Sequence, residues 1–255
     1  MSSDEAKVRE FYESVSEKGW DFPDAPHTSN GKLWSFYEGV VKHRIAESAD
    51  YHADILLDIG TGGGEKILAI AHHFHLVVGI DNSPGMIVTA NKKRAKKPTR
   101  NTRFLKMEAD AIRFPDEFFD VITCRHSHFR ATEVFRLLRK GEYFFTQQVG
   151  EGDKFNIKQF FGRGQQFGER DGMAVTRQVQ ELNRAGFSSV ELQDYDAVEF
   201  YQDHDSLRSL LTHAPILMDF GGPEDEAKLA EFVRQNTTTQ GIKTNSRRYL
   251  IIARK

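Results

Sequence analysis

The chain has 255 residues, of which 39% are hydrophobic and 28% charged, and its formal net charge at pH 7 is −2. This composition excludes wholesale disorder, and the near-neutral charge gives no general attraction for nucleic acid or an anionic membrane surface. A single cysteine, Cys124, excludes an intrachain disulfide and predicts a reducing, cytoplasmic environment. We expect neither a signal peptide nor a membrane span, because the first ten residues are polar and no apolar run is long enough.

Two helices are expected before the first strand. Apolar spacing predicts a short helix over residues 5–16 and a clearer one over 32–48, separated by the loop GWDFPDAPHTSNG. The lid candidates in this region are Trp20, His27, Trp34 and Tyr37.

The stretch 55–81, ILLDIGTGGGEKILAIAHHFHLVVGID, predicts a strand, a glycine-rich loop, a helix and a second strand that ends at Asp81. Glycines at 60, 62, 63 and 64 let the backbone adopt positive φ and approach a ligand closely. An acid about twenty residues after such a loop is placed to accept hydrogen bonds from a ribose. The stretch therefore predicts a site for an adenosine-containing ligand.

The glycine spacing distinguishes between the adenosine cofactors. A dinucleotide fingerprint, G-x-G-x-x-G, would need its third glycine at Glu65. Asp58 and Asp81 would repel a pyrophosphate but attract the cationic S-adenosylmethionine, which has no phosphate. The run from Asp58 to Gly64 resembles the motif [D/E]-x-G-x-G-x-G of class I S-adenosylmethionine-dependent methyltransferases. The resemblance implies that Asp58, Gly60, Thr61, Gly62 and Gly64 bind this cofactor.

The same resemblance implies a fold class. It is a Rossmann-like α/β fold, with a seven-stranded, mostly parallel sheet, an antiparallel last strand and helices on both faces. The resemblance covers residues 50–150 firmly and the later elements loosely. We therefore predict a methyltransferase domain over 51–255, with 150–175 and 200–240 as lid or elaboration inserts. Residues 1–50 would form a helical cap, which either crosses the cofactor cleft or covers one sheet edge.

The sequence IDNSPGMI resembles the family's second motif. By that resemblance Asp81 would hold the ribose hydroxyls, while Asn82 and Met86 would lie near the adenine; Met86 is equally compatible with a core position. Ser83 and Pro84 favour a helix start here. The basic run KKRAKKPTR follows, and we interpret it as a solvated helix end rather than a nucleic-acid patch.

A third strand is expected over 103–108 and a fourth from Phe119. In the family a carboxylate after the third strand accepts a hydrogen bond from the adenine amino group, and Asp110 with Ala111 occupies that place. FPDEFFDVITCRHSHF resembles the fourth motif, with Arg125 and His126 at the carboxyl end of the strand, where open α/β sheets bind ligands. Cys124 is predicted to be a buried strand residue rather than a nucleophile.

The remaining elements follow in order. A helix is predicted over 133–140 and a strand from Gly141, in a segment that resembles the signature E-x-x-R-V-L-K-P-G-G-x-F but has Arg139-Lys140 and Glu142 in place of usual residues. Residues 150–175 carry six glycines and four phenylalanines, which indicates an irregular segment. It is either an active-site lid or a packed surface excursion. Further elements are predicted as helices over 176–185, 205–212 and 223–235 and strands over 189–193 and 248–254.

Methyl transfer from a sulfonium is an in-line displacement, which mainly requires alignment of the reacting atoms. A base is needed only if the acceptor must lose a proton, and His126 is the candidate, with solvent exposure as the alternative interpretation. The histidines at 72, 73 and 75 match no zinc-ligand spacing, so no metal is expected.

Three functions remain open. The first is methyl transfer to a small-molecule acceptor. The second is methylation of RNA or protein, against which the near-neutral charge and the sequence Cys124 to Ser127, in place of an N-P-P-Y-type tetrapeptide, both argue. The third is an NAD-dependent oxidoreductase or a non-catalytic S-adenosylmethionine-binding protein. No pattern indicates an oligomeric state.

Overall fold

The computed structural model describes residues 10–11, 13–17, 27–30, 35–97 and 99–255. Their strands form one mixed sheet in the order β1-β7-β9-β6-β5-β2-β3-β4, and β8 pairs with β9. The strands are β1 (His27–Ser29), β2 (Ile55–Ile59), β3 (Leu76–Asp81), β4 (Thr102–Lys106), β5 (Phe119–Arg125), β6 (Leu138–Val149), β7 (Ser189–Tyr201), β8 (Thr237–Thr238) and β9 (Gly241–Arg254).

The predicted fold class is confirmed. Strands β2 to β6 run parallel, and β9 lies antiparallel between β6 and β7. Strand β5 is buried along almost its whole length, as expected of a central strand of a parallel sheet covered on both faces. The predicted seven strands correspond to β2–β7 and β9, and the short strands β1 and β8 were not predicted.

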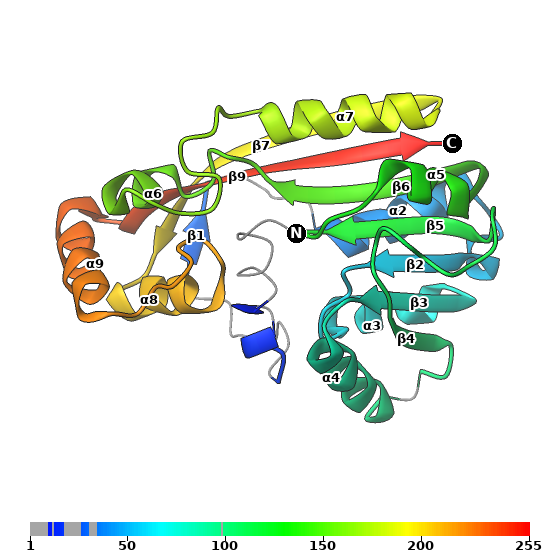
Figure 1. Cartoon of the computed structure of the whole chain (residues 1–255), viewed down its shortest axis with the longest axis horizontal. Helices are drawn as coiled ribbons and strands as arrows, with labels where there is room; N and C mark the ends of the chain where they lie inside the picture. Colours follow the sequence, from blue (N-terminus) through cyan, green and yellow to red (C-terminus); the bar gives the residue numbers. More distant parts are fainter. Residues whose placement is uncertain (1–9, 12, 18–26, 31–34, 98) are drawn as a thin grey trace.

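Helices cover both faces of the sheet (Figure 1). One face carries an apolar cluster that includes Leu56, Val121, Phe145 and Leu250 and lies under α2 and α3. The other face carries a second apolar cluster, which lies under α5 and α7. None of the described helices is long and apolar enough to cross a membrane. The helices are α2 (Phe36–Glu47), α3 (Glu65–Ile70), α4 (Pro84–Ala95), α5 (Ala131–Leu137), α6 (Phe155–Phe161), α7 (Met173–Ala185), α8 (His204–His213) and α9 (Pro223–Asn236), with 3-10 turns at Tyr51–Ala53 and Ala71–His73.

Strands β7 and β9 extend well beyond the rest of the sheet. Strand β6 stops at Val149, opposite Arg248, whereas β9 continues to pair with β7 as far as Ile242 opposite Tyr201. Helices α6, α8 and α9 pack on this extension around a third apolar cluster, and we call them the helical lobe (Figure 1). Both strands are longer than the predicted 189–193 and 248–254, and residues 155–161 of the segment expected to be irregular form α6.

The N-terminal residues that the structure describes lie against the carboxyl edge of the sheet. The Thr89 hydroxyl of α4 donates to the carbonyl of Ser16 at 2.7 Å, and Glu13 accepts a hydrogen bond from Ser83. Helix α2 begins four residues later than predicted and buries Phe36 and Val40. Most of the helix predicted over 5–16, and the lid candidates Trp20 and Trp34, lie outside the described residues.

Candidate active site

The glycine-rich loop between β2 and α3 needs residues without a side chain. Gly60, Gly62 and Gly64 have φ values of 72°, 56° and 78°, in the left-handed region that glycine adopts without penalty. A Cβ atom at Gly64 would lie 2.7 Å from the ring of Phe104, and one at Gly60 would lie 2.2 Å from the Ser127 hydroxyl. The loop therefore packs closely against its surroundings.

The loop uses most of its backbone amides within the protein. Gly60 and Thr61 both donate to the carbonyl of Ile80, each at 2.9 Å. Gly62 donates to Oδ2 of Asp81 at 2.9 Å, and the amide of Gly64 bonds within the loop. A loop that cradles a pyrophosphate must point such amides at the ligand. This loop instead fixes the end of β3.

Asp81, at the end of β3, is the carboxylate that this loop positions. Its Oδ1 accepts the amide of Ser83 at 2.9 Å, while Oδ2 accepts that of Gly62. Burial raises the pKa of Asp81, and these backbone hydrogen bonds act in the opposite direction. Since a carboxylate oxygen has two acceptor sites, each oxygen can accept one further hydrogen bond. Asp81 is thus oriented to receive two neighbouring hydroxyl groups.

A pocket of about 90 Å³ lies at this edge of the sheet. Asp110, which lines it, accepts a hydrogen bond at 2.9 Å from the exposed ring of His128, and Arg130 lies 3.4 Å away. Met86 is only 1% exposed and does not line the pocket. The lining residues are Ile59, Gly60, Ile80, Asp81, Asn82, Met107, Glu108, Ala109, Asp110, Ser127 and His128, with no lysine or arginine among them.

A larger cavity, of about 420 Å³, lies away from these residues. It is lined by Asp116, Glu117, Phe135, Arg136 and Lys255. Because Glu117 precedes β5 and Lys255 follows the antiparallel β9, this cavity lies at the opposite edge of the sheet from the glycine loop. Its charged residues pair with one another, as in the ion pair of Arg136 with Asp116 at 2.7 Å. It contains no predicted site residue.

Asp58, at the end of β2, is buried beneath α2. The Thr123 hydroxyl donates to Oδ1 of Asp58 at 2.7 Å, and the Tyr37 hydroxyl donates to the same oxygen at 3.2 Å. Burial raises the pKa of Asp58 to about 6, although these hydrogen bonds oppose the rise. The carboxylate is therefore largely ionised at pH 7. Tyr37, a lid candidate, thus ties α2 to the glycine loop.

Polar side chains cross the sheet from Asp58 on the α2 face. Arg125 on β5 donates through Nε to Oε1 of its strand partner Gln147 at 3.1 Å. On β9, Arg248 shares the face of Leu250, which lies opposite Gln147, because side chains alternate along a strand. At the carboxyl edge, the sheet face under α2 is therefore polar rather than apolar. We call this set of side chains the polar band; it comprises Asp58, Thr123, Arg125, Gln147 and Arg248 and continues onto the extension of β9.

His126 directly follows β5 in this band. Its backbone has φ of 53°, and its amide donates to the carbonyl of Gln147 at 2.9 Å. Its Nε2 atom is buried and has no hydrogen-bond partner among the described residues. Burial, and then the charges of Arg125 and Arg248, hold the pKa of His126 well below its ordinary value. The imidazole is therefore neutral at pH 7 and can accept a proton.

Comparison with known proteins identifies the domain to which this edge of the sheet belongs. A family model described as a methyltransferase domain matches residues 56–141. An uncharacterized methyltransferase of Bacillus subtilis, YcgJ, is 29% identical over 122 residues, which are 46% of this chain and 48% of that protein. A putative methyltransferase from Bacillus halodurans has a similar structure, with a TM-score of 0.60 at 18% identity over 85% of this chain and 99% of that one.

A second similar structure was solved with bound ligands. It is a phosphoethanolamine N-methyltransferase from Haemonchus contortus, solved with phosphomonomethylethanolamine and S-adenosylhomocysteine, with a TM-score of 0.55 at 16% identity over all of this chain and 58% of that one. Residues 56–141 of this chain therefore form a methyltransferase domain. The methyltransferase domain predicted from the sequence is thereby confirmed for these residues. The activity of the whole protein and its cofactor, S-adenosylmethionine, stay predictions. The chain spans about half the length, 48%, of the curated relative YcgJ.

The residues of the methyltransferase domain fit this cofactor. The pocket presents the carboxylate of Asp81 with free acceptor capacity and has no lysine or arginine in its lining. The amides of Gly60 and Gly62, which a pyrophosphate would need, are already bonded. An adenosine without phosphates suits this pocket, because its ribose hydroxyls can donate to Asp81 and it needs neither the loop amides nor a cationic side chain.

Two members of the polar band were not identified from the sequence. Thr123 resembles any inward residue of a buried strand, and only its bond to Asp58 reveals its role. Arg248 begins the predicted last strand, more than a hundred residues from the motifs, so no spacing rule could relate it to His126.

Cys124 is fully buried, and burial raises the pKa of its thiol, so the structure gives it no activating environment. Among the described residues, no three metal-ligating side chains lie together.

The buried neutral state of His126 predicts a pH effect on stability. Its folded pKa lies well below the ordinary 6.5, so the unfolded chain takes up a proton that the folded chain does not. The neutral ring therefore contributes to the free energy of unfolding above pH 6.5, and this contribution is lost as the pH falls. Between pH 7 and pH 5 the wild type should lose about 1–2 kcal/mol more than His126→Gln in urea unfolding. Parallel pH profiles would contradict this account.

Proposed function

We propose that this protein transfers a methyl group from S-adenosylmethionine to a small-molecule acceptor. The observation that carries the proposal is the hydrogen bonding of the glycine loop, whose amides orient Asp81 rather than point outward. That arrangement favours a ligand with ribose hydroxyls and no phosphates. It argues against the alternative of an NAD-dependent oxidoreductase.

Most of the predicted cofactor-binding residues keep their proposed roles. Asp81 would hold the ribose hydroxyls, and Asn82 would lie near the adenine together with Asp110 and Ala111. Asp58 would provide negative charge near the cationic part of the cofactor, because it is largely ionised at pH 7. Thr61 and Arg125 complete the proposed set, with Arg125 suited by its charge to the cofactor's carboxylate. Met86 is instead a core residue, because it is buried and does not line the pocket.

The bound cofactor supplies a methyl group that its sulfonium makes electrophilic. The chain's own contribution is mainly to hold the acceptor in line, which can lower a barrier by up to about 7–11 kcal/mol. Where the acceptor is a phenol or a carbon acid, its proton must also leave. His126 is proposed to accept that proton, because its ring is neutral and its Nε2 has no hydrogen-bond partner among the described residues.

A small acceptor is favoured over RNA or protein by what surrounds the carboxyl edge. The helical lobe and strand β1 stand beside it, and residues 13–16 contact the start of α4 (Figure 1). The basic residues over 92–97 and Arg100 lie between the last turn of α4 and the first residue of β4, at the opposite edge of the sheet. Cations there would not guide a nucleic acid toward His126.

The test is a labelling experiment. The protein is incubated with methyl-labelled S-adenosylmethionine and a cell extract separated into small molecules and macromolecules. We expect label in the small-molecule fraction, with release of S-adenosylhomocysteine. Label confined to RNA or protein would support the second function instead. A protein that binds the cofactor but labels neither fraction would be a non-catalytic binder.

A further inference from the structure

Arg248 has a hydrogen-bonding edge that the protein does not use. Its Nη1 atom forms an ion pair with Asp153 and donates to the carbonyl of Arg247 at 3.2 Å. Within the described part of the chain, no hydrogen bond or ion pair involves its Nε or Nη2 atoms. The side chain is only 18% exposed. A mostly buried guanidinium thus keeps two parallel N–H donors available on its Nε–Nη2 edge.

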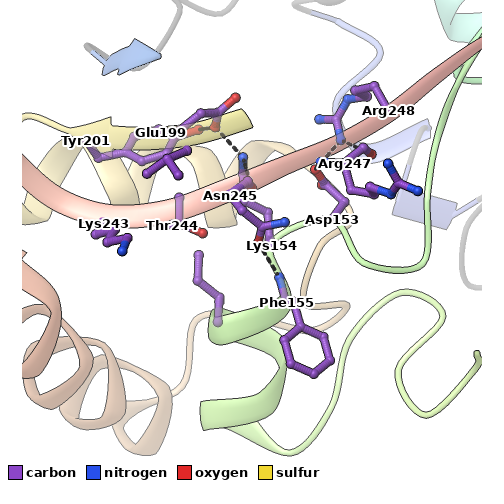
Figure 2. A network of polar contacts seen from close by, with 12 residues as sticks. Asp153, Lys154, Phe155, Glu199, Tyr201, Lys243, Thr244, Asn245, Arg247 and Arg248 are labelled. Atoms are coloured by element: carbon purple, nitrogen blue, oxygen red, sulfur yellow. Dashed lines mark hydrogen bonds and ion pairs between the residues drawn. The ribbon is translucent and has the colours of Figure 1, made fainter. Parts of the chain in front are cut away.

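Hydrogen bonds of the neighbouring residues hold the guanidinium of Arg248 in place. Asp153 is 3% exposed, and the same oxygen that binds Arg248 accepts the backbone amide of Arg247 at 2.9 Å. Asn245 on β9 fixes the adjoining segment, because its side chain accepts the amide of Phe155 at 2.9 Å and donates to the carbonyl of Gly152 at 2.8 Å. Figure 2 shows these contacts around β9. The orientation of Arg248 is therefore set by the fold.

The other charges near Arg248 do not neutralise the unused edge. Lys154 and Glu199, both buried, form an ion pair with each other, and the Tyr201 hydroxyl donates to Glu199 at 3.3 Å (Figure 2). Asp153 is already bonded on the Nη1 side. The positive charge of Arg248 also helps to lower the pKa of His126, so the imidazole in the same polar band is neutral.

A second unpartnered polar group lies on the same face of β9. Ser246, two residues from Arg248, is fully buried, and its hydroxyl has no hydrogen-bond partner among the described residues. The Nε2 atom of His126 is unpartnered in the same sense. Buried polar groups are rarely left without partners, so two such groups in the same polar band as Arg248 indicate a ligand.

We propose that the Nε–Nη2 edge of Arg248 binds an anionic oxygen group of the methyl acceptor, a carboxylate or a phosphate, and holds the acceptor beside His126. The planar guanidinium matches two oxygens of either group with two parallel hydrogen bonds. Arg248 would then determine specificity for an acidic acceptor. The inference rests on the proposed function, because it places the acceptor in the methyltransferase site.

The experiment follows the His126 ring by NMR in protein saturated with S-adenosylhomocysteine. The probes are benzoate, inorganic phosphate and, as the neutral analogue, benzamide. We expect benzoate or phosphate to shift the His126 signal, and benzamide to leave it in place. Arg248→Gln should weaken the anion response at least about tenfold, because it removes a charge-assisted pair of hydrogen bonds. Arg248→Lys keeps the positive charge and so the ion pair with Asp153, but it should also weaken the anion response, because it lacks the planar pair of donors.

The matched control is Arg247→Gln. Arg247 is the neighbouring arginine, but its side chain pairs with Asp171 at 3.1 Å, away from the band. This variant should respond to anions like the wild type. A response to benzoate alone would identify a carboxylate, and one to phosphate alone a phosphate group.

Two results would overturn the inference while leaving the proposed function intact: no anion response in the cofactor-saturated wild type, or equal responses in wild type and both Arg248 variants. Failure to bind S-adenosylhomocysteine, measured first by calorimetry, would instead remove the proposed function itself and the inference with it.

Discussion

Replacing Gly64 with alanine is expected to lower the free energy of unfolding by about 3 kcal/mol. Two costs add. The left-handed backbone, with φ of 78°, costs a residue with a Cβ about 1–2 kcal/mol. The new Cβ would also lie 2.7 Å from the ring of Phe104, which is 5% exposed and cannot turn outward freely. Relieving such an overlap in a packed core costs typically about 1–3 kcal/mol.

Gly172 provides the matched control for this prediction. It also precedes a helix, with φ of 86°, but a Cβ there would meet nothing within 4 Å. Gly172→Ala should therefore cost only the backbone term, about 1–2 kcal/mol. Urea unfolding of both variants measures the difference. Equal losses would show that the contact between the glycine loop and Phe104 does not constrain the site.

Asp81→Ala should weaken binding of S-adenosylhomocysteine by about 1.5–3 kcal/mol, or roughly ten- to 150-fold. The ribose would lose hydrogen bonds to a charged acceptor, and the amides of Gly62 and Ser83 would lose the carboxylate that they orient. Asp81→Asn, which keeps the shape, should fall between the wild type and the alanine variant. Isothermal titration calorimetry gives the affinities.

The control for the Asp81 variants is Asp116→Ala. Asp116 is an acid at the opposite edge of the sheet, with a side chain 72% exposed. Its removal changes the net charge equally but should leave the affinity unchanged. If Asp81→Ala also binds the cofactor product normally, the ribose assignment is wrong.

The part of the fold that could be predicted from the sequence is the part that local rules determine. Strands β2 and β3 are apolar runs bounded by glycines and an acid, and the end of β2 at Ile59 was predicted correctly. Strand β6 was expected from Gly141 but begins at Leu138, because residues after α5 pair with β5 across an irregular register. Such pairing depends on a neighbouring strand and leaves no mark in local spacing.

The extension of β7 and β9 was missed for a different reason. A half-buried strand is recognised by alternating apolar residues, but the inward positions here include Thr244, Ser246 and Glu199. Their burial is stabilised by polar contacts from another segment, such as the ion pair of Glu199 with Lys154. The helical lobe and the anion-binding edge of Arg248 both depend on this extension, so they too were outside the reach of sequence patterns.

The candidate site, like the fold, was predicted only in part. Motif spacing brought Asp58, the glycines and Asp81 to one edge, and the structure places them there. It could not show that the loop amides are already bonded, nor that His126 is buried and has its pKa lowered by the charges of two arginines. Those are properties of packing, and they carry the chemical argument.

The measurement that tests the central claim most directly is the melting temperature with S-adenosylhomocysteine and, separately, with NADH. Each ligand is used at a hundredfold excess over its expected dissociation constant. A ligand that binds only the folded chain then adds about 2.7 kcal/mol, which should raise the melting temperature by roughly 5–10 °C. We predict this rise with S-adenosylhomocysteine and none with NADH. A rise with NADH alone would contradict the methyltransferase assignment and the interpretation of the glycine loop.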